Sequence, residues 1–338
     1  MQKKQISFSF LVLAFNHESY IIEHLESIKY QILRYGQGIK VDILINDDCS
    51  RDKTVDYIEK WISFNKSIFN RVVVNYSQNN RGTCASVVDL LLSIETSLFK
   101  LTAGDDIYSF ENIFEAAIAD DNIAFKVGFP LFIEDGILRE NLISNILTIS
   151  TEVVYSKKSI VKHFTNFSYN NAPNMFYNLN CIKDIGTIKF IQNFDVTEDW
   201  PIQLAISRLH PQKKIKYMDK VLVYYRRTSG STYIVANSRF INDKLKIFRF
   251  LIENSHSYLD KLRISIRQSA FKISNKYISR IINIDLHIYL FECFLNVRTI
   301  YNKWKNLNLD ERKHVIHLEF IKNRAVVFLR DFINNGLT

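Results

Sequence analysis

The chain has 338 residues, 47% of them hydrophobic, which excludes a disordered protein and suggests one substantial domain with a smaller one. Its formal charge of +9 comes from residues 239–338, which hold 18 Lys and Arg against 9 Asp and Glu; residues 1–238 hold 26 of each. Four scattered cysteines exclude a disulfide framework or a zinc site, which needs closely spaced ligands, and fit a reducing cytosol best.

The first apolar run, residues 6–15, follows Lys3-Lys4 and so imitates a signal peptide. Asn16, His17 and Glu18 come next, without a small-residue cleavage site. We therefore interpret this run as a buried first strand.

Strand-like runs and helical patterns alternate through the first 120 residues, which predicts a parallel sheet covered by helices. The predicted strands span residues 6–15, 41–45, 72–76 and 97–103, and the helices begin near Tyr20, Asp52, Thr83 and Phe110. In such a sheet, ligands bind beyond the carboxyl ends of the strands. Those ends read Asn16-His17, Asp47-Asp48, Gln78-Asn79 and Asp105-Asp106.

The pattern is mixed between residues 120 and 225, where we expect a strand at Glu152 to Tyr155, a short helix ending at Gly186 and a strand from Val221 to Tyr225. Beyond about residue 239 the chain is predicted to be helical and to pack directly on the sheet domain. Two apolar stripes support this: Leu259, Leu262, Ile266, Ala270, Ile273 and Tyr277, then Leu318, Ile321, Ala325, Phe328 and Phe332.

The most apolar later segment, residues 281–295, is too short to span a membrane and is interrupted by Asp285, His287 and Glu292. The positive charge of the last hundred residues suits an anionic partner, and an incidental solvated basic face explains it about equally well. Nucleic acid is the less favoured partner, because the basic residues are mixed with apolar stripes rather than with exposed aromatic platforms.

Two pairs of carboxylates stand where apolar strands end. Asp47 and Asp48 precede a helix; the residues from Asp48 onward also match the ligand spacing of a calcium loop, but Lys53 replaces its required glycine. Asp105 and Asp106 offer hard oxygen ligands to Mg²⁺ or Mn²⁺, ions that few carboxylates bind together with substrate phosphates. A plain turn would also explain the second pair, and its register with the first makes it informative.

Thr197-Glu198-Asp199-Trp200-Pro201 opens a predicted helix. Acidic residues and an early proline favour a helix N-terminus without any further role. In the functional interpretation Asp199 is a general base, a carboxylate that takes the proton of an attacking hydroxyl.

These segments form an ordered set that resembles the inverting family 2 glycosyltransferases of the GT-A fold, over about residues 6–235. The motifs are Ala14-Phe15-Asn16-His17-Glu18, Asn46-Asp47-Asp48-Cys49-Ser50, Asn79-Asn80-Arg81-Gly82-Thr83, Ala103-Gly104-Asp105-Asp106 and Thr197-Glu198-Asp199-Trp200.

The resemblance implies a role for each motif. Residues around the first strand and after the second would hold the nucleotide, and Asp106 with Asp105 would hold Mg²⁺ or Mn²⁺ on the donor diphosphate. Asp199 would be the base. The residues assigned to the donor are Phe15, Asn16, Asp47, Asp48, Arg81, Asp105, Arg226 and Arg227. The last two lie in the segment 225–231, which resembles the end of the catalytic domain, although many relatives have His where Thr228 stands.

We therefore predict an α/β GT-A domain over residues 1–235, a Rossmann-like mixed sheet, and a C-terminal helical region over 236–338 that docks on a membrane or acceptor, or mediates dimerisation. The expected activity is transfer of one sugar, with inversion, from a nucleotide-sugar donor such as a UDP-sugar to a glycan acceptor. The resemblance implies a polyprenyl-diphosphate-linked acceptor, bacterial surface polysaccharide synthesis, and a cytoplasmic, peripheral membrane location. The alternative is a non-catalytic carbohydrate-binding or scaffold protein that keeps the fold.

Overall fold

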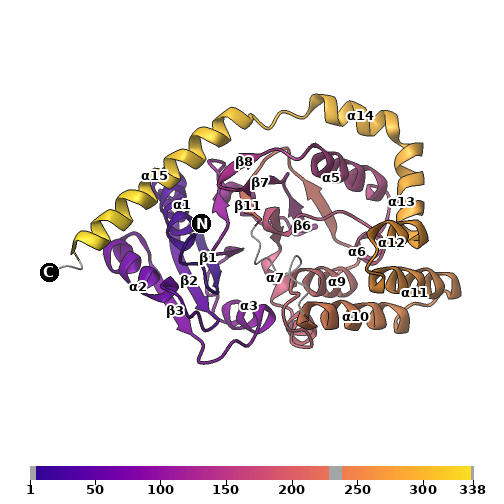
Figure 1. The fold of residues 1–338 in the computed structure, drawn as a ribbon, viewed down its shortest axis with the longest axis horizontal. Helices are drawn as coiled ribbons and strands as arrows, with labels where there is room; N and C mark the ends of the chain where they lie inside the picture. Colours follow the sequence, from indigo (N-terminus) through magenta and orange to yellow (C-terminus); the bar gives the residue numbers. More distant parts are fainter. Residues whose placement is uncertain (1–4, 228–237, 336–338) are drawn as a thin grey trace.

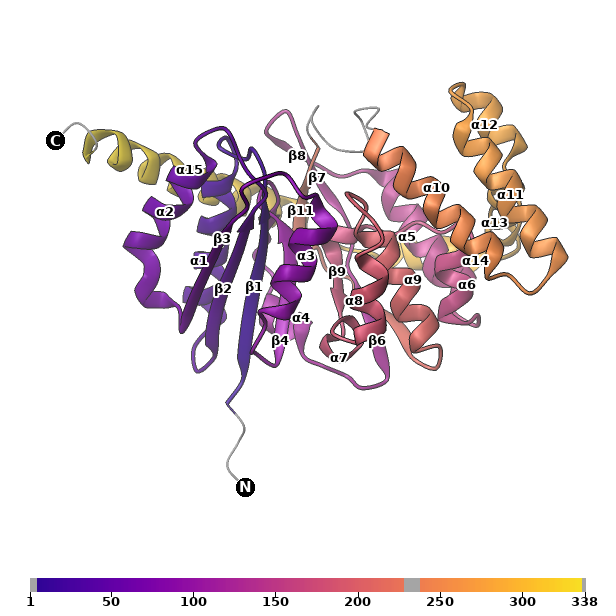
Figure 2. The same ribbon diagram turned by 90° about the horizontal axis from the view of Figure 1, so that it is seen from below.

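A four-stranded parallel sheet with strand order β3-β2-β1-β4 forms the N-terminal part of the molecule (Figures 1 and 2). The computed structural model describes the backbone of residues 5–227 and 238–335, and side chains up to residue 331. The strands are β1 (Ser7–Ala14), β2 (Lys40–Asp47), β3 (Arg71–Tyr76) and β4 (Leu98–Ala103). All four predicted strands and their parallel arrangement are confirmed.

Helices cover both faces of this sheet, and β1 shows why its sequence is apolar throughout. Phe8, Phe10 and Val12 pack toward α1 (Ile21–Tyr35) and α2 (Thr54–Asn65). Leu11 and Leu13 pack toward α3 (Thr83–Leu92) on the opposite face. Because successive side chains of a strand alternate between faces, a strand buried on both sides must be apolar at nearly every position.

The strands of this sheet end together. Leu13 of β1 lies opposite Asn46 of β2 and Ala103 of β4, so the loops that follow these strands meet at one edge. This is the upper edge of the sheet in Figure 2. The acidic motifs at the strand ends are therefore brought together, as their register predicts.

Two smaller sheets extend the fold. One has the order β5-β11-β7-β8 and the other β10-β6-β9. Their strands are β5 (Ile107–Tyr108), β6 (Ile123–Val127), β7 (Leu131–Glu134), β8 (Ile137–Arg139), β9 (Met175–Tyr177), β10 (Lys214–Tyr217) and β11 (Val223–Arg226). The helices between them are α4 (Ile113–Ala117), α5 (Leu142–Tyr155), α6 (Ile160–Thr165), α7 (Leu179–Ile182), α8 (Ile185–Ile191) and α9 (Asp199–Leu209). The strand predicted at 221–225 is confirmed as β11, displaced slightly toward the C-terminus.

Two predictions in this middle part are wrong. Glu152 to Tyr155 is not a strand but the last turn of α5, whose start is capped by the side chain of Asn141. Burial of Ile149 and Val154 against neighbouring elements outweighs the strand propensity of the β-branched residues there. Gly186 does not end a helix but lies at the start of α8, where the Asp184 side chain accepts a hydrogen bond from its backbone N–H at 2.8 Å.

The C-terminal region is helical, as predicted, and packs directly on the rest of the chain. Its helices are α10 (Ser238–Glu253), α11 (Tyr258–Lys272), α12 (Lys276–Ile282), α13 (Ile284–Leu295), α14 (Val297–Asn306) and α15 (Glu311–Asn335). In both ribbon views α10 lies beside α9, and its residues Ile247, Phe248 and Leu251 join the core that α3 and α9 also form. The predicted domain boundary near residue 235 lies outside the described residues.

The two apolar stripes have different outcomes. Leu318, Ile321 and Ala325 of α15 are buried, and this helix runs back to α1, where Arg324 Nε pairs with Glu26 Oε2 at 2.7 Å (Figure 1). The first stripe is not a buried face, because α11 ends at Lys272 and α12 starts in a new direction. Leu259, Leu262 and Tyr277 are exposed. No helix among the described residues is both long and apolar enough to cross a membrane.

Candidate active site

A cleft of about 870 Å³ opens at the carboxyl edge of the parallel sheet. Its walls come from the loops after β1, β2 and β4, from the start of α9, and from α10 and α11. Among the residues that line it are Phe15, Asn16, Asp48, Asp105, Asp106, Asp199, Trp200, Lys244 and Arg267. The two halves of the chain thus share one site.

Asp47 organises the loop after β2. Its carboxylate is buried and accepts hydrogen bonds from both the backbone N–H, at 2.8 Å, and the hydroxyl of Ser50. Ser50 Oγ in turn accepts from the backbone N–H of Asn16 at 2.8 Å, and Asn16 Oδ1 accepts from the N–H of Arg51 at 2.9 Å. The loops after β1 and β2 are therefore held to each other, and Asp47 does not line the cleft.

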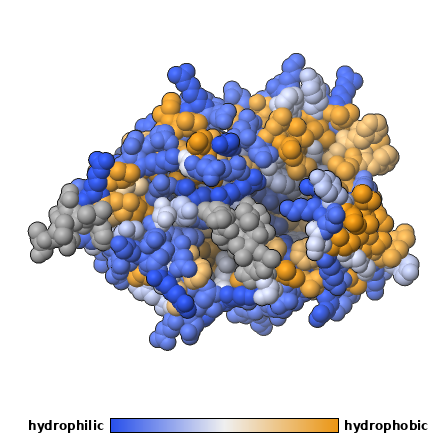
Figure 3. Space-filling view, viewed as in Figure 1, coloured by the Kyte–Doolittle hydropathy of each residue, from blue (hydrophilic) through white to orange (hydrophobic). Residues whose placement is uncertain are grey.

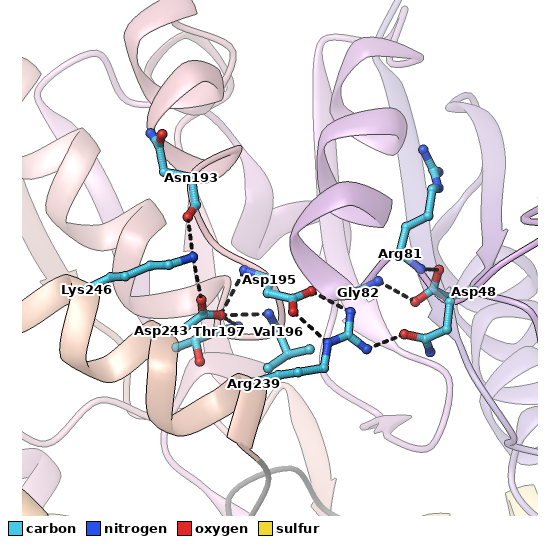
Figure 4. A network of polar contacts seen from close by, with 11 residues as sticks. Asp48, Arg81, Gly82, Asn193, Asp195, Val196, Thr197, Arg239, Asp243 and Lys246 are labelled. Carbon is cyan, nitrogen blue, oxygen red and sulfur yellow. Dashed lines mark hydrogen bonds and ion pairs between the residues drawn. The ribbon is translucent and has the colours of Figure 1, made fainter.

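Asp48 holds the start of α3. Its two carboxylate oxygens accept the backbone N–H groups of Arg81 and Gly82, each at 2.8 Å (Figure 4). The Arg81 side chain pairs instead with Asp89, and Arg81 does not line the cleft. Gly82 has a φ of +89°, and a Cβ there would lie 2.4 Å from the carbonyl oxygen of Asp195. Only glycine fits this close approach of two loops.

The Asp105–Asp106 turn is clamped from behind. Arg226 donates from Nε to the Asp105 carbonyl at 2.7 Å and from its backbone N–H to Asp106 Oδ1 at 2.9 Å. Its guanidinium also pairs with Glu23. The buried ring of His24 donates from Nδ1 to the Asp106 carbonyl at 2.7 Å. These contacts hold the backbone of the turn and the carboxylate of Asp106.

Asp106 is electrostatically suited to a cation. Burial and the neighbouring charge of Asp105 raise its pKa well above the usual range, which means that the anion is poorly stabilised by the protein alone. Across the described ranges, no three His, Cys, Asp or Glu side chains could hold a metal by themselves. Mg²⁺ and Mn²⁺ commonly bind one or two carboxylates plus substrate phosphates, so this carboxylate pair fits such an ion.

Asp199 is the first residue of α9, and its side chain caps nothing. The N-cap position is Glu198, without a side-chain capping bond, and Asp199 has no hydrogen-bond partner among the described residues. Burial raises the pKa of Asp199 to about 6, while the charges of Lys100 and Lys244 act to lower it. A carboxylate with this pKa, free to face the cleft, can accept a proton near neutral pH.

Helix α10 holds the loop that leads to Asp199. The fully buried Asp243 accepts three consecutive backbone N–H groups through Oδ2, from residues 195, 196 and 197, at 2.8, 2.8 and 3.1 Å. Figure 4 shows this cluster beside Arg239, which forms a two-pronged ion pair with Asp195 and donates to Asn80 Oδ1 at 2.5 Å. One helix of the C-terminal region therefore ties the loop before α9 to the loop before α3.

The charged wall opposite the sheet was not predicted from the sequence. Lys244 of α10 lies 4.7 Å from the Trp200 ring centroid, and Arg267 Cζ of α11 lies 5.2 Å from it. Burial lowers the pKa of Lys244 to about 8, although nearby acidic groups oppose this. Arg267 pairs with Asp285 at 3.3 Å, whereas Lys244 has neither a hydrogen bond nor an ion pair within the described part of the chain. The sequence of this region shows only a helical period and a net positive charge, and neither feature predicts that a residue lines a cleft.

Several buried polar atoms that line the cleft also lack partners. They are Nδ1 of His17, both amide atoms of Asn46, and the hydroxyls of Ser86, Tyr177 and Thr197. Buried polar groups are nearly always hydrogen-bonded in native proteins, so a group of such atoms around one cleft indicates a polar ligand. The place of Ser86 in the cleft could not be predicted, because it lies within a helix rather than at a strand end.

The predicted site residues thus divide into two groups. Phe15, Asn16, Asp48, Asp105, Asp106 and Asp199 line one cleft. Asp47, Arg81, Arg226 and Arg227 do not; the Arg227 guanidinium pairs with Glu134 at 2.9 Å and stacks on Phe132. The donor-binding roles of all these residues stay predictions, and Thr228 lies outside the described residues.

Comparisons with known proteins bear on the fold and on the family. Residues 9–122 match the model of glycosyl transferase family 2. No curated protein matches the chain in sequence.

Solved structures resemble the fold. TarS 1-349 of S. aureus in complex with UDP-GlcNAc is 16% identical, with a TM-score of 0.53 over 98% of this chain and 92% of that one. In another TarS structure, 18% identical with a TM-score of 0.51, 80% of this chain covers only 45% of the TarS chain. The mannosyltransferase PcManGT from Pyrobaculum calidifontis, in complex with GDP-Man and Mn²⁺, is 12% identical, with a TM-score of 0.51 over 96% and 87% of the two chains. The chain therefore has the GT-A fold with a helical C-terminal region, and the family match over residues 9–122 supports a glycosyltransferase.

Proposed function

We propose that the chain transfers one sugar from a UDP-sugar, either a hexose or an N-acetylhexosamine, to a glycan acceptor with inversion at the anomeric carbon. The observation that carries this proposal is that Asp48, the pair Asp105–Asp106 and Asp199, which come from separate parts of the chain, line one cleft. A nucleotide site, a metal site and a base are the three parts that such a transfer needs.

The donor would lie along the edge of the sheet. Phe15, Asn16 and Asp48 would contact the nucleoside, and Asp105 with Asp106 would hold Mg²⁺ or Mn²⁺ on the diphosphate. The bound ion would offset the negative charge that develops on the leaving diphosphate. Arg226 contributes by holding the Asp105–Asp106 turn in place.

Asp199 would act as the general base in a single displacement. The oxygen of an acceptor hydroxyl forms a bond to the anomeric carbon as its proton passes to the Asp199 carboxylate. The bond from that carbon to the diphosphate oxygen breaks, and the nucleoside diphosphate leaves with the electron pair. The pKa of about 6 keeps Asp199 mostly deprotonated at neutral pH and still basic enough to accept this proton.

The acceptor would enter along the wall formed by α9, α10 and α11. Trp200 is fixed by a hydrogen bond from Nε1 to the Phe164 carbonyl at 2.9 Å, which gives a sugar ring a rigid aromatic surface. Lys244 beside it supplies a cation that contacts the Trp200 ring and has no hydrogen bond or ion pair from its side chain among the described residues. These features support a glycan acceptor that carries an anionic group, and the diphosphate of a polyprenyl-linked glycan in bacterial surface polysaccharide synthesis meets that description.

The activity can be tested by incubating the chain with a panel of nucleotide sugars and measuring release of the nucleoside diphosphate with Mn²⁺, with Mg²⁺ and with excess chelator. We expect metal-dependent turnover of a UDP-sugar. Calorimetry with UDP would separate the alternative, a non-catalytic protein of the same fold: that protein would bind UDP while turning over no donor on the panel.

An exposed apolar surface on α11–α14 supports peripheral membrane binding. We define it by Tyr258, Leu259, Tyr277, Ile278, Ile281, Ile288, Phe291, Phe294, Leu295 and Val297, all of which are exposed. Apolar side chains gather on the side of the molecule where these helices lie (Figure 3). Exposed apolar side chains that gather on one side of a molecule commonly mark an interaction site.

The charges around this surface favour an anionic lipid bilayer as the partner. Residues 258–306 contain nine Lys and Arg against three Asp and Glu. All three acidic residues already have basic partners within the chain, since Asp260 pairs with Arg263, Asp285 with Arg263 and Arg267, and Glu292 with Lys158. Exposed bases such as Lys276 and Arg280 remain, each contributing about 1 kcal/mol near an anionic membrane. The cytoplasmic location implied by the resemblance stays a prediction.

Vesicle flotation would test this surface. The full chain should float with vesicles containing anionic phosphatidylglycerol, less so at high salt, and Phe291→Ser with Phe294→Ser should abolish flotation. Leu33→Ser is the matched control, since Leu33 is an exposed apolar residue on α1, away from this surface. A wild-type chain that ignores anionic vesicles at low salt but forms a dimer sensitive to the paired substitutions would show that a second copy covers the surface instead.

A further inference from the structure

The C-terminal helix α15 packs against both elements that hold the Asp105–Asp106 turn. The turn is held by β11 through Arg226 and by α1 through His24. None of the described residues of α15 lines the cleft, so this helix has no part in the chemistry proposed above. It nevertheless meets β11 and α1 through buried and half-buried polar side chains, which fix its position more closely than apolar contacts alone would.

Two histidines of α15 bind one hydroxyl of β11. The Tyr224 hydroxyl lies 2.9 Å from Nδ1 of His314, 3.2 Å from Nδ1 of His317 and 3.3 Å from the carbonyl oxygen of His314. All three residues are buried, and burial lowers the pKa of His314 to about 4 and that of His317 to about 3, so both rings are neutral at neutral pH. A tyrosine hydroxyl has a single proton, so at least one of the rings must donate its Nδ1–H to the hydroxyl oxygen. Removal of the hydroxyl would therefore leave a buried N–H without a partner.

Tyr224 lies beside the turn in the smaller sheet. In the antiparallel pair of β5 and β11 it is the register partner of Ile107, the residue that follows Asp106. Two residues further along β11, the backbone N–H of Arg226 donates to Asp106 Oδ1 at 2.9 Å. The hydroxyl that α15 holds is therefore separated from the acidic turn by one short strand pair only.

A second link runs through α1. Glu26 is 3% exposed, and its two carboxylate oxygens accept from Trp61 Nε1 at 2.8 Å and from Arg324 Nε of α15 at 2.7 Å. Removing one partner of a buried charge is costly, because the remaining charge is poorly stabilised by the protein interior. His24, two residues before Glu26 on the same helix, donates to the Asp106 carbonyl. A shift of α1 at Glu26 would therefore be felt at the turn.

We propose that α15 positions the Asp105–Asp106 turn from outside the cleft, through Tyr224 of β11 and Glu26 of α1. The inference rests on the proposed function, because it concerns the divalent ion that this turn would hold. Groups that contact a metal ligand orient it, and their loss commonly costs about 10–100-fold in metal affinity. Tyr224 and Glu26 act one contact further away, so their loss should cost less, about three- to tenfold.

Binding of Mn²⁺ tests the proposal without turnover. The Kd of Mn²⁺ would be measured in the presence of saturating UDP, from the electron paramagnetic resonance signal of the free ion. In Tyr224→Phe, which removes the shared hydroxyl, this Kd should rise about three- to tenfold. Tyr289→Phe is the matched control, because Tyr289 is also buried and its hydroxyl bonds to Thr151 Oγ1 at 2.9 Å, between α13 and α5. Both variants should melt at a lower temperature, but the control should keep the wild-type Kd.

Arg324→Met tests the link through α1 and should raise the same Kd about threefold. Lys322→Met is its control. Lys322 also joins α15 to the rest of the chain, since it donates to the carbonyl of Gly136 in the turn between β7 and β8. These two strands lie beyond β11 on the side away from β5, so this contact should have no effect on the metal.

The outcomes separate positioning from stability. If Tyr224→Phe and Arg324→Met bind Mn²⁺ as their controls do, whether all four match the wild type or all four bind more weakly, α15 contributes stability alone and the proposal is overturned. Should Tyr224→Phe fail to fold, Arg324→Met, at a half-buried position, decides the question by itself. A wild type that binds no Mn²⁺ in the presence of UDP would instead overturn the metal site of the proposed function, and this inference with it.

Discussion

The two sides of the cleft are built differently. On the sheet side, the carboxylates of Asp47 and Asp48 are already satisfied by backbone N–H groups and a hydroxyl, and Arg226 clamps the Asp105–Asp106 turn. On the helical side, Asp199 and Lys244 lie in the cleft without hydrogen-bond partners among the described residues. The groups on the sheet side are therefore held in place by the protein itself. The charged groups on the helical side remain available to a ligand.

The largest effect is expected on the helical side. Asp199→Asn keeps the shape of the side chain but removes its basicity, so turnover should fall by about 10²–10⁴, while UDP binding measured by calorimetry should change little. Single-turnover kinetics with the preferred donor would measure this. Unchanged turnover would leave Asp199 as an ordinary residue of a helix N-terminus.

On the sheet side, Asp106→Asn should cost about 10²–10³ in kcat/KM, because a neutral amide binds the metal poorly. The amide oxygen can still accept the backbone N–H of Arg226, so the fold should be kept. The metal concentration for half-maximal activity should rise in the same variant. Asp121→Asn, an exposed change, is the control, and full activity of Asp106→Asn in excess chelator would contradict the metal site.

Substitution of Asp243 tests whether α10 holds the loop before α9 in place. Asp243→Ala leaves three backbone N–H groups without their acceptor, so the free energy of unfolding should drop by about 1–3 kcal/mol. Displacement of the loop should lower kcat about tenfold with a smaller change in the KM for the donor. Asp243→Asn retains an acceptor and should recover part of both losses, which denaturant titration and steady-state kinetics would show.

The smallest effect concerns pH. Asp199 has a pKa of about 6 and must be deprotonated to accept the proton, so kcat should rise with pH through this value. Lys244→Met removes a positive charge that favours the anion, so the pKa should rise and the acid limb should move to higher pH, by about one unit. Arg249→Met, on the exposed face of the same helix, should leave the limb in place. If the acid limb of the pH profile stays in place in Lys244→Met, the charge of Lys244 does not influence the pKa of Asp199.

The same contrast explains what the sequence could predict. Asp47 and Asp48 stand at the end of β2, and Asp105 and Asp106 come shortly after the end of β4, so the register of one parallel sheet was enough to bring the two pairs to the same edge. Lys244 and Arg267 reach the cleft only through the packing of α10 and α11, which depends on apolar contacts between residues far apart in the chain. The prediction of a strand at Glu152 to Tyr155 was wrong for a related reason, because burial against other elements decided the conformation of β-branched residues.

The packing of α15 on α1 has a consequence for how the chain folds during its synthesis. It packs on α1 through the Arg324–Glu26 pair and the contact of Tyr30 with the His317 ring, whose centroids lie 4.6 Å apart. Chains emerge from the ribosome N-terminus first, so α1 is synthesised long before α15, the helix that packs on it. During that time its apolar surface is open to chaperones or to other nascent chains. A chain that stops before α15 would therefore contain all the acidic strand-end motifs and still lack the helix that covers α1.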